Sequence, residues 1–107
     1  MRKLHSNQEL AAIKALSPTA ELRYRAPAQG GDGTWYVHVP YVEVGDGRFL
    51  QSLNQAGKTS VAAINECFRQ LTQLPKGHCI VLYAYDPTRR REMFWNDFMW
   101  ADRVKGD

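Results

Sequence analysis

The sequence has few cysteines, no strong excess of one charge and no long apolar run, and each of these absences excludes a class of protein. Its two cysteines, Cys67 and Cys79, have no C-x-x-C neighbour, and the three histidines are too scattered to complete a zinc site. We therefore expect no metal and no disulfide, with both thiols reduced and buried as core residues.

No apolar run approaches the roughly 18 residues of a membrane-spanning helix, and the polar residues after the first five do not form a signal-peptide core. A chain of 107 residues that is 44% hydrophobic, 11% aromatic and 23% charged has the composition of one folded domain and not of a disordered chain. We expect a soluble, cytoplasmic protein of a bacterial cell or of an infected host cell.

The net charge of +3 comes from the beginning of the chain. Residues 1–25 contain five basic residues against two acidic ones, whereas the remaining residues contain nine of each. A protein that binds duplex nucleic acid usually carries a concentrated basic face. The equal numbers of acidic and basic residues after residue 25 therefore give only weak support to nucleic-acid binding.

The beginning of the chain predicts a helix and then a strand. Ser6-Asn7-Gln8-Glu9 has the form of a capping box, and the apolar positions after it predict a short helix over residues 7–16 that Pro18 ends. From Ala20 the apolar residues alternate with a period of two, which predicts a half-buried strand. The glycines of residues 30–33 predict a tight turn with positive φ angles.

A long second strand is predicted next, with Val37 and Val39 on one face and Val42 on the other. Pro40 cannot donate a hydrogen bond to a neighbouring strand, which predicts an edge position or a bulge there. A return strand over residues 48–53 completes an antiparallel meander of three strands.

A second helix is predicted to begin at Thr59 or Ser60. The preceding Gly57 and Lys58 do not complete a phosphate-binding loop, because Ser52 occupies the position of its first glycine, so they predict an ordinary helix start. The apolar stripe of this helix repeats at steps of three and four and comprises Val61, Ile64, Phe68 and Leu71.

Residues 78–85 are almost continuously apolar, which predicts a strand that is covered on both faces or that has one face in an oligomer contact. The last stretch predicts a hairpin with a two-residue turn at Asn96-Asp97, between strands near 90–95 and 98–102, and with Trp95 and Trp100 paired across it. The prediction is therefore one α+β domain with a single antiparallel sheet, made of an N-terminal helix (1–18), a β-β-β-α-β core (20–85) and an aromatic C-terminal hairpin (86–103).

The core resembles the HicB-type antitoxin family. Trp35-Tyr36-Val37-His38-Val39-Pro40 is a tyrosine-bearing strand that ends in proline, and Gly57-Lys58-Thr59 with Ala63 matches the G-x-T helix start of that family and the alanine four residues later. The resemblance covers residues 20–85 and implies a partial RNase H-like domain that self-associates and neutralises a small RNA-cleaving toxin. Tyr41 stands where the family has aspartate after the proline, and no DNA-binding segment of the helix-turn-helix type follows the core.

The tail over residues 90–100 resembles the ends of small phage and prophage proteins, which often have Asn-Gly where this chain has Asn96-Asp97. Small phage proteins often bind and block a host factor. This second resemblance implies a phage or prophage origin and carries no assigned activity of its own.

No catalytic constellation stands out, because neither His38 nor His78 has a serine, cysteine or carboxylate placed beside it by the sequence. We predict a non-enzymatic protein-interaction module without a cofactor, which binds and inhibits a bacterial host or toxin protein and also forms a homo-oligomer. Aromatic anchors dominate interface energies. The predicted contact residues are Tyr83, Tyr85, Trp95, Phe98 and Trp100, and Arg89, Arg90 and Arg91 form the predicted charged rim.

Two other functions stay open at this point. A nucleic-acid-binding protein would use the same arginines and tyrosines together with Arg23 and Arg25, with unpaired bases stacked on sheet aromatics and phosphates held by the guanidinium groups. A small hydrolase would need catalytic residues that no motif in the sequence identifies.

Overall fold

The computed structural model describes two helices and seven strands. The helices are α1 (Ser6–Leu16) and α2 (Ser60–Thr72), and neither is long and apolar enough, within the described part of the chain, to cross a membrane. The strands are β1 (Glu21–Arg25), β2 (Thr34–His38), β3 (Pro40–Val44), β4 (Arg48–Ser52), β5 (Ile80–Tyr83), β6 (Arg90–Trp95) and β7 (Trp100–Asp102). The described residues are 4–27, 30–31, 33–44, 48–52, 57–74, 80–83 and 90–103.

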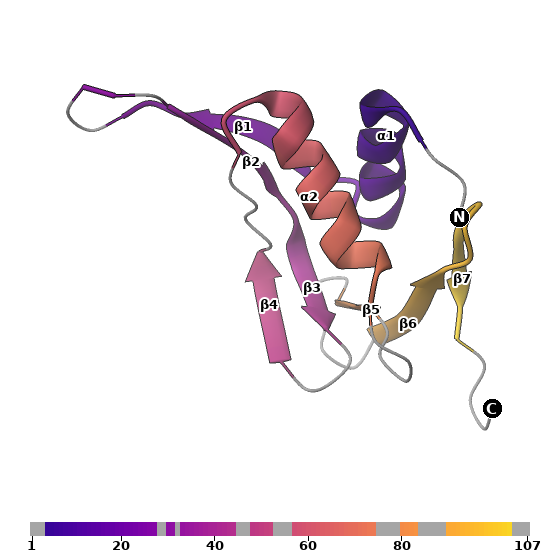
Figure 1. Cartoon of the computed structure of the whole chain (residues 1–107). Helices are drawn as coiled ribbons and strands as arrows, with labels where there is room; N and C mark the ends of the chain where they lie inside the picture. Colours follow the sequence, from indigo (N-terminus) through magenta and orange to yellow (C-terminus); the bar gives the residue numbers. More distant parts are fainter. Residues whose placement is uncertain are drawn as a thin grey trace.

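The strands form two antiparallel sheets, and together with the helices they confirm the predicted α+β class. β1 and β2 make a two-stranded sheet, which we call the ribbon, and the other sheet has the order β4-β3-β5-β6-β7. The prediction of a single sheet that begins with a three-stranded meander was wrong, because the second predicted strand is divided between the two sheets. Figure 1 shows the ribbon projecting at one end of the molecule and the β6–β7 hairpin at the other.

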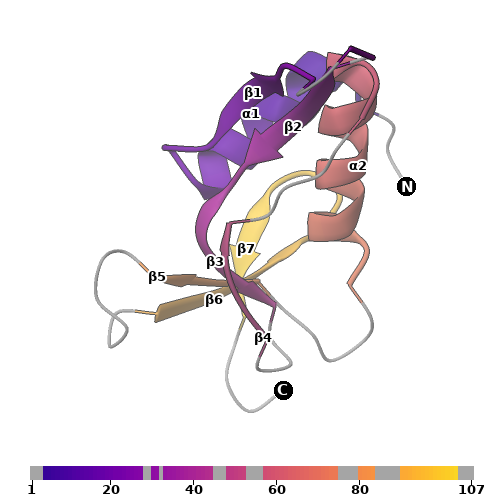
Figure 2. The same cartoon turned by 90° about the vertical axis from the view of Figure 1, so that its left-hand side faces the viewer.

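Pro40 marks the point where this second strand changes sheets. Proline has no amide hydrogen and cannot continue a regular ladder, so β2 ends at His38 and β3 begins at Pro40. Figure 2 shows the chain bending here from the ribbon into the larger sheet. Val37, Val39 and Val42 are all fully buried, although an unbroken strand would place Val42 on the opposite face.

Helix α1 begins one residue before its predicted start. His5 is the N-cap, and its amide donates to Gln8 Oε1 over 2.9 Å, so the cap uses Gln8 and not Glu9. Glu9 is partly buried instead, and this burial raises the pKa of its carboxyl group. The helix ends at Leu16 as predicted.

Helix α2 has the predicted start and a slightly rotated buried face. Thr59 Oγ1 accepts the amide of Ala62 over 3.1 Å, as expected of an N-cap threonine. Val61 was predicted on the buried stripe, but it is 49% exposed because the helix turns the side that carries Ala63 toward the sheet. The buried residues of α2 are Ala63, Ile64, Cys67 and Leu71.

The core is shared by both helices and both sheets. Ile80 and Val81 are neighbours in β5 and both are fully buried, which confirms that this strand is covered on both faces. Cys67 is fully buried as predicted, and burial raises the pKa of its thiol to about 12. The buried cluster comprises Ile13, Leu16, Ala20, Val37, Val39, Val42, Ile64, Cys67, Leu71, Ile80 and Met93.

The glycine turn and the return strand agree with the sequence. Gly30 and Gly31 have φ angles of +48° and +118°, which confirms the predicted glycine turn. β3 and β4 pair in antiparallel fashion, as predicted for the return strand. Residues 45–47, Cys79 and residues 84–89, which follow β5, lie outside the described residues.

Glu66 on α2 is expected to make stability depend on pH. Its carboxylate accepts hydrogen bonds from Arg69 Nε over 2.9 Å and from Gln70 Nε2 over 3.1 Å. These bonds lower the pKa of Glu66 from 4.5 to about 2, and the bond from Arg69 has the larger effect. Because the pKa is lower in the folded chain, the stabilisation is present above pH 4.5 and is lost as the pH falls toward 2. The melting temperature of the wild type should therefore fall more steeply over this interval than that of the E66Q variant. Equal slopes in both proteins would contradict this role.

Candidate functional site

The aromatic tail forms a hairpin of β6 and β7, which we call the C-terminal hairpin. Four residues connect its strands, so the predicted two-residue turn was wrong. Asn96 Oδ1 accepts the amides of Phe98 over 2.9 Å and of Met99 over 2.8 Å, and in this way the asparagine side chain closes the longer turn. Asp97 has a φ of +79°, the left-handed conformation expected in this turn.

The inner face of the C-terminal hairpin is held to both helices by its tryptophans. Trp95 and Trp100 are opposite each other with ring centroids 5.1 Å apart, which confirms the predicted pair. The Trp95 ring also meets Phe68 of α2 edge to face at 5.3 Å, and Trp100 Nε1 donates to the Ala12 carbonyl of α1 over 2.8 Å. Both indoles are partly buried, so they position the hairpin and present less surface to a partner than we predicted.

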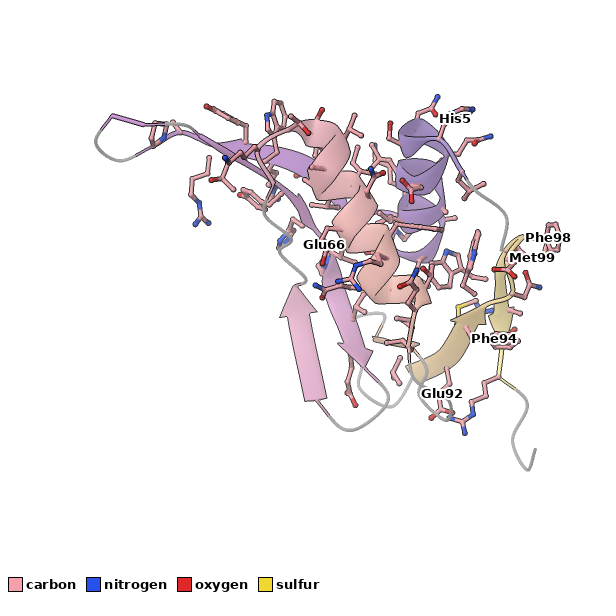
Figure 3. All side chains as sticks on the ribbon, viewed as in Figure 1. His5, Glu66, Glu92, Phe94, Phe98 and Met99 are labelled. Carbon is pink, nitrogen blue, oxygen red and sulfur yellow. The ribbon has the colours of Figure 1, made fainter. Side chains whose placement is uncertain are left out.

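Apolar side chains are exposed on the other face and at the turn of the same hairpin. Phe94 is 43% exposed, Phe98 is 66% exposed and Met99 is 61% exposed. Figure 3 shows Phe98 and Met99 at the turn, on the side of the molecule opposite the ribbon. These three residues, which we call the exposed apolar set, are most of the large hydrophobic side chains that are exposed in the described part of the chain.

Sequence reasoning identified Phe98 as a contact residue and missed Phe94 and Met99. A signal for Phe94 was present, because Met93, Phe94 and Trp95 are consecutive apolar residues and a strand sends neighbours to opposite faces. Met93 and Trp95 point to the core side, and Phe94 therefore points outward. Met99 gave no such signal, since its exposure depends on the four-residue turn.

The structure describes only part of the predicted contact set. Tyr83 ends β5, but its side chain and the whole of Tyr85 lie outside the described residues. Arg89 also lies outside them, and Arg90 begins β6 with a side chain that is not described. The roles of these four residues stay predictions.

Arg91 of the predicted rim forms an ion pair within the C-terminal hairpin. Its Nη2 lies 2.8 Å from Asp102 Oδ1, and its Nε donates to the same oxygen over 3.0 Å. Both side chains are more than 60% exposed, so the pair contributes at most about 1 kcal/mol to stability. Arg91 therefore carries charge at the surface without fixing the fold.

The two arginines of the ribbon lie on its outer face. Leu22 packs on the core, so Arg23 next to it, and Arg25 two residues further along β1, point to the other face. Arg23 Nη2 lies 2.8 Å from Glu21 Oε2, and the Arg25 guanidinium lies 5.3 Å from the centre of the Tyr36 ring. Because the ribbon and the C-terminal hairpin are at opposite ends of the molecule (Figure 1), these arginines do not join the predicted rim.

The titratable side chains give no support to a metal site in the part of the chain that is described, where no group of three or more His, Cys, Asp or Glu residues could hold an ion. His38 is partly exposed on β2 and stands opposite Glu21 in the ribbon. His78 lies outside the described residues.

Comparisons with protein-family models, with curated proteins and with solved structures found no match to this chain. The resemblances to HicB-type antitoxins and to phage proteins therefore rest on the motifs quoted above. What the chain does has to follow from the chemistry of its own surface.

Proposed function

We propose that this protein is a non-enzymatic interaction module that binds another protein through the C-terminal hairpin. The observation that carries the proposal is the exposed apolar set, Phe94, Phe98 and Met99, on a hairpin whose inner face is held by Trp95 and Trp100. Aromatic and methionine side chains are enriched in protein interfaces. A hairpin that is already held in place also loses less conformational entropy on binding.

Burial of the exposed apolar set supplies the free energy of association. Complete burial of one large apolar side chain is worth about 1.5–3 kcal/mol relative to full exposure, and these side chains are already partly covered. A partner that covers them gains about 1 kcal/mol from each. Together they change the dissociation constant by about 100-fold.

The partner we propose is a bacterial host protein or a toxin protein, met in the cytoplasm by a protein of phage or prophage origin. What supports this finer assignment is the resemblance of residues 20–85 to HicB-type antitoxins and of residues 90–100 to phage proteins. The exposed apolar set supports the more general statement that a protein partner binds.

The test is affinity capture from a bacterial lysate, with and without nuclease, by the wild type and by an F94S/F98S/M99S variant. The wild type should retain a protein after nuclease treatment. The variant should bind the same protein with a dissociation constant about 100-fold higher, because the apolar contact is lost.

V61S is the matched control for this variant. Val61 is also an exposed apolar residue, 49% exposed, but it lies on α2 outside the C-terminal hairpin. The V61S protein should bind as the wild type does, and melting curves should show that all three proteins are folded. Equal binding by the wild type and the triple variant would contradict the proposal.

A second candidate, nucleic-acid binding, is favoured by one observation on the ribbon. Arg23 and Arg25 share its outer face with the partly exposed ring of Tyr36, and in single-strand binding arginines hold phosphates while an aromatic ring stacks on an unpaired base. This function predicts affinity for single strands that falls steeply with salt and is weaker in an R23A/R25A variant. Loss of every captured protein on nuclease treatment, together with this salt dependence, would favour it over protein binding.

A further inference from the structure

β7 is the last strand of the larger sheet, and its hydrogen-bonding pattern shows which of its groups face outward. Two backbone bonds flank the β6–β7 ladder, from Asn96 N to Met99 O (3.1 Å) and from Arg103 N to Glu92 O (2.8 Å). Hydrogen-bonded pairs alternate with open pairs in an antiparallel ladder. The residue midway between these bonds on β7 is Ala101, so its amide and carbonyl face β6.

The amides and carbonyls of Trp100 and Asp102 consequently face away from β6. Within the described part of the chain no strand pairs with this side of β7. An edge strand with free backbone groups is a template for another strand. This edge lies beside two members of the exposed apolar set, Phe94 and Met99.

We propose that β7 pairs in antiparallel fashion with β7 of a second copy of the chain, about a two-fold axis that passes through Ala101. In this register Trp100 of each copy is opposite Asp102 of the other, and these are the residues whose backbone groups face outward. The inference concerns the backbone edge of the sheet and goes beyond the binding of a second protein.

The register follows from the residues on either side of Ala101. An axis through Asp102 would place two carboxylates directly opposite each other, which is destabilising. An axis through Trp100 would need Phe98 to pair as a strand residue, but its amide already donates to Asn96 Oδ1 over 2.9 Å in the closed turn. With the axis through Ala101, two small uncharged side chains meet instead.

The side chains around this axis are self-complementary. Phe94 is the neighbour of Ala101 on the outer face, so the two copies form one row of Phe94, Ala101, Ala101 and Phe94 across the joined sheets. Met99 of one copy, 61% exposed, stands opposite Arg103 of the other, whose aliphatic stem can cover it. The Asp102 carboxylate keeps its own Arg91 as counter-charge.

The test is sedimentation equilibrium of the purified chain over a range of concentrations. The wild type should reach twice the chain mass of 12.2 kDa as its concentration rises. A101E and A101K should each stay monomeric, because either one brings like charges together at the axis, and an equal mixture of the two should form the dimer again. Recovery in the mixture also shows that both variants are folded.

A second pair of variants separates the contribution of the Asp102 backbone amide to dimer formation from that of the Asp102 side chain. D102P removes the outward amide without removing a bond to β6 and should abolish the dimer, whereas D102A removes the carboxylate but keeps the amide and should dimerise. A wild type that stays monomeric at the highest concentration, or A101E and A101K proteins that dimerise separately, would overturn the inference. These measurements use one purified chain, so they are independent of whether a partner is captured.

Discussion

Replacing Trp100 with alanine is expected to lower the free energy of unfolding by about 3 kcal/mol. The change removes an indole that packs against the core, its ring contact with Trp95 and its hydrogen bond to the Ala12 carbonyl. Since about 1 kcal/mol displaces the melting temperature of a domain of this size by roughly 4–8 °C, we expect a fall of more than about 10 °C. Thermal unfolding followed by circular dichroism measures it.

Two further variants separate the contributions of Trp100. W100F keeps one aromatic ring but loses the donor to Ala12 and the second ring of the indole, so it should cost about 1–2 kcal/mol, less than W100A. F98A changes a side chain that is 66% exposed on the same hairpin and should cost less than about 1 kcal/mol. If W100A were no less stable than F98A, Trp100 would not be the residue that holds the hairpin to α1.

Replacing Gly57 with alanine is expected to cost about 2 kcal/mol, because the added methyl group has no room. A Cβ atom at this position would lie 2.8 Å from the Ala63 amide nitrogen and 3.2 Å from the Ala62 carbonyl carbon, and both are backbone atoms of the first turn of α2. Gly57 also exchanges two backbone hydrogen bonds with Trp35 of β2, of 2.8 and 2.9 Å. The chain must move there, and these bonds must lengthen.

The matched control for G57A is K58A, the change of an exposed neighbour, which should alter stability by less than about 0.5 kcal/mol. Denaturant unfolding of the two variants gives the comparison. G57A should also change the near-ultraviolet circular dichroism of Trp35, since the two residues are hydrogen-bonded. A G57A protein as stable as K58A would show that Gly57 and α2 are not in close contact.

Gly57 shows how a sequence motif and its structural reason can differ. The sequence excluded a phosphate-binding loop at Gly57-Lys58-Thr59 and predicted an ordinary helix start, and Thr59 is the N-cap as predicted. The need for glycine was not visible in the sequence. It comes from the first turn of α2, where the backbone atoms of Ala62 and Ala63 lie too close to leave room for a Cβ atom.

Local physical chemistry explains the predictions that are confirmed. Thr59 caps α2 and the strand at Ile80 and Val81 is buried on both faces, because capping and apolar content act over a few residues. The predictions that were wrong depended on contacts between residues far apart in the chain, or on a shift of one residue in the start or the buried face of a helix. The N-cap of α1 is His5 and not the predicted Ser6. Val61 lies outside the core because α2 packs a different side on the sheet.

The candidate site divides in the same way. The sequence was sufficient to predict a C-terminal hairpin with Trp95 and Trp100 close together across it, although the four-residue turn that places them directly opposite each other was not predicted. It was not sufficient to show which rings face solvent. Phe94 is exposed while Trp95 is partly buried, because only the second of these neighbours meets Phe68 of α2.

By itself, the sequence determined the α+β class, the start of α2, the glycine turn and the existence of the hairpin, because the preferences behind them involve residues close together in the chain. Only the tertiary structure decided that Pro40 divides one strand between two sheets, that the arginines of the ribbon lie far from the hairpin, and which apolar side chains stay exposed. The reason is that exposure depends on contacts such as that of Trp100 with Ala12, which join residues 88 positions apart.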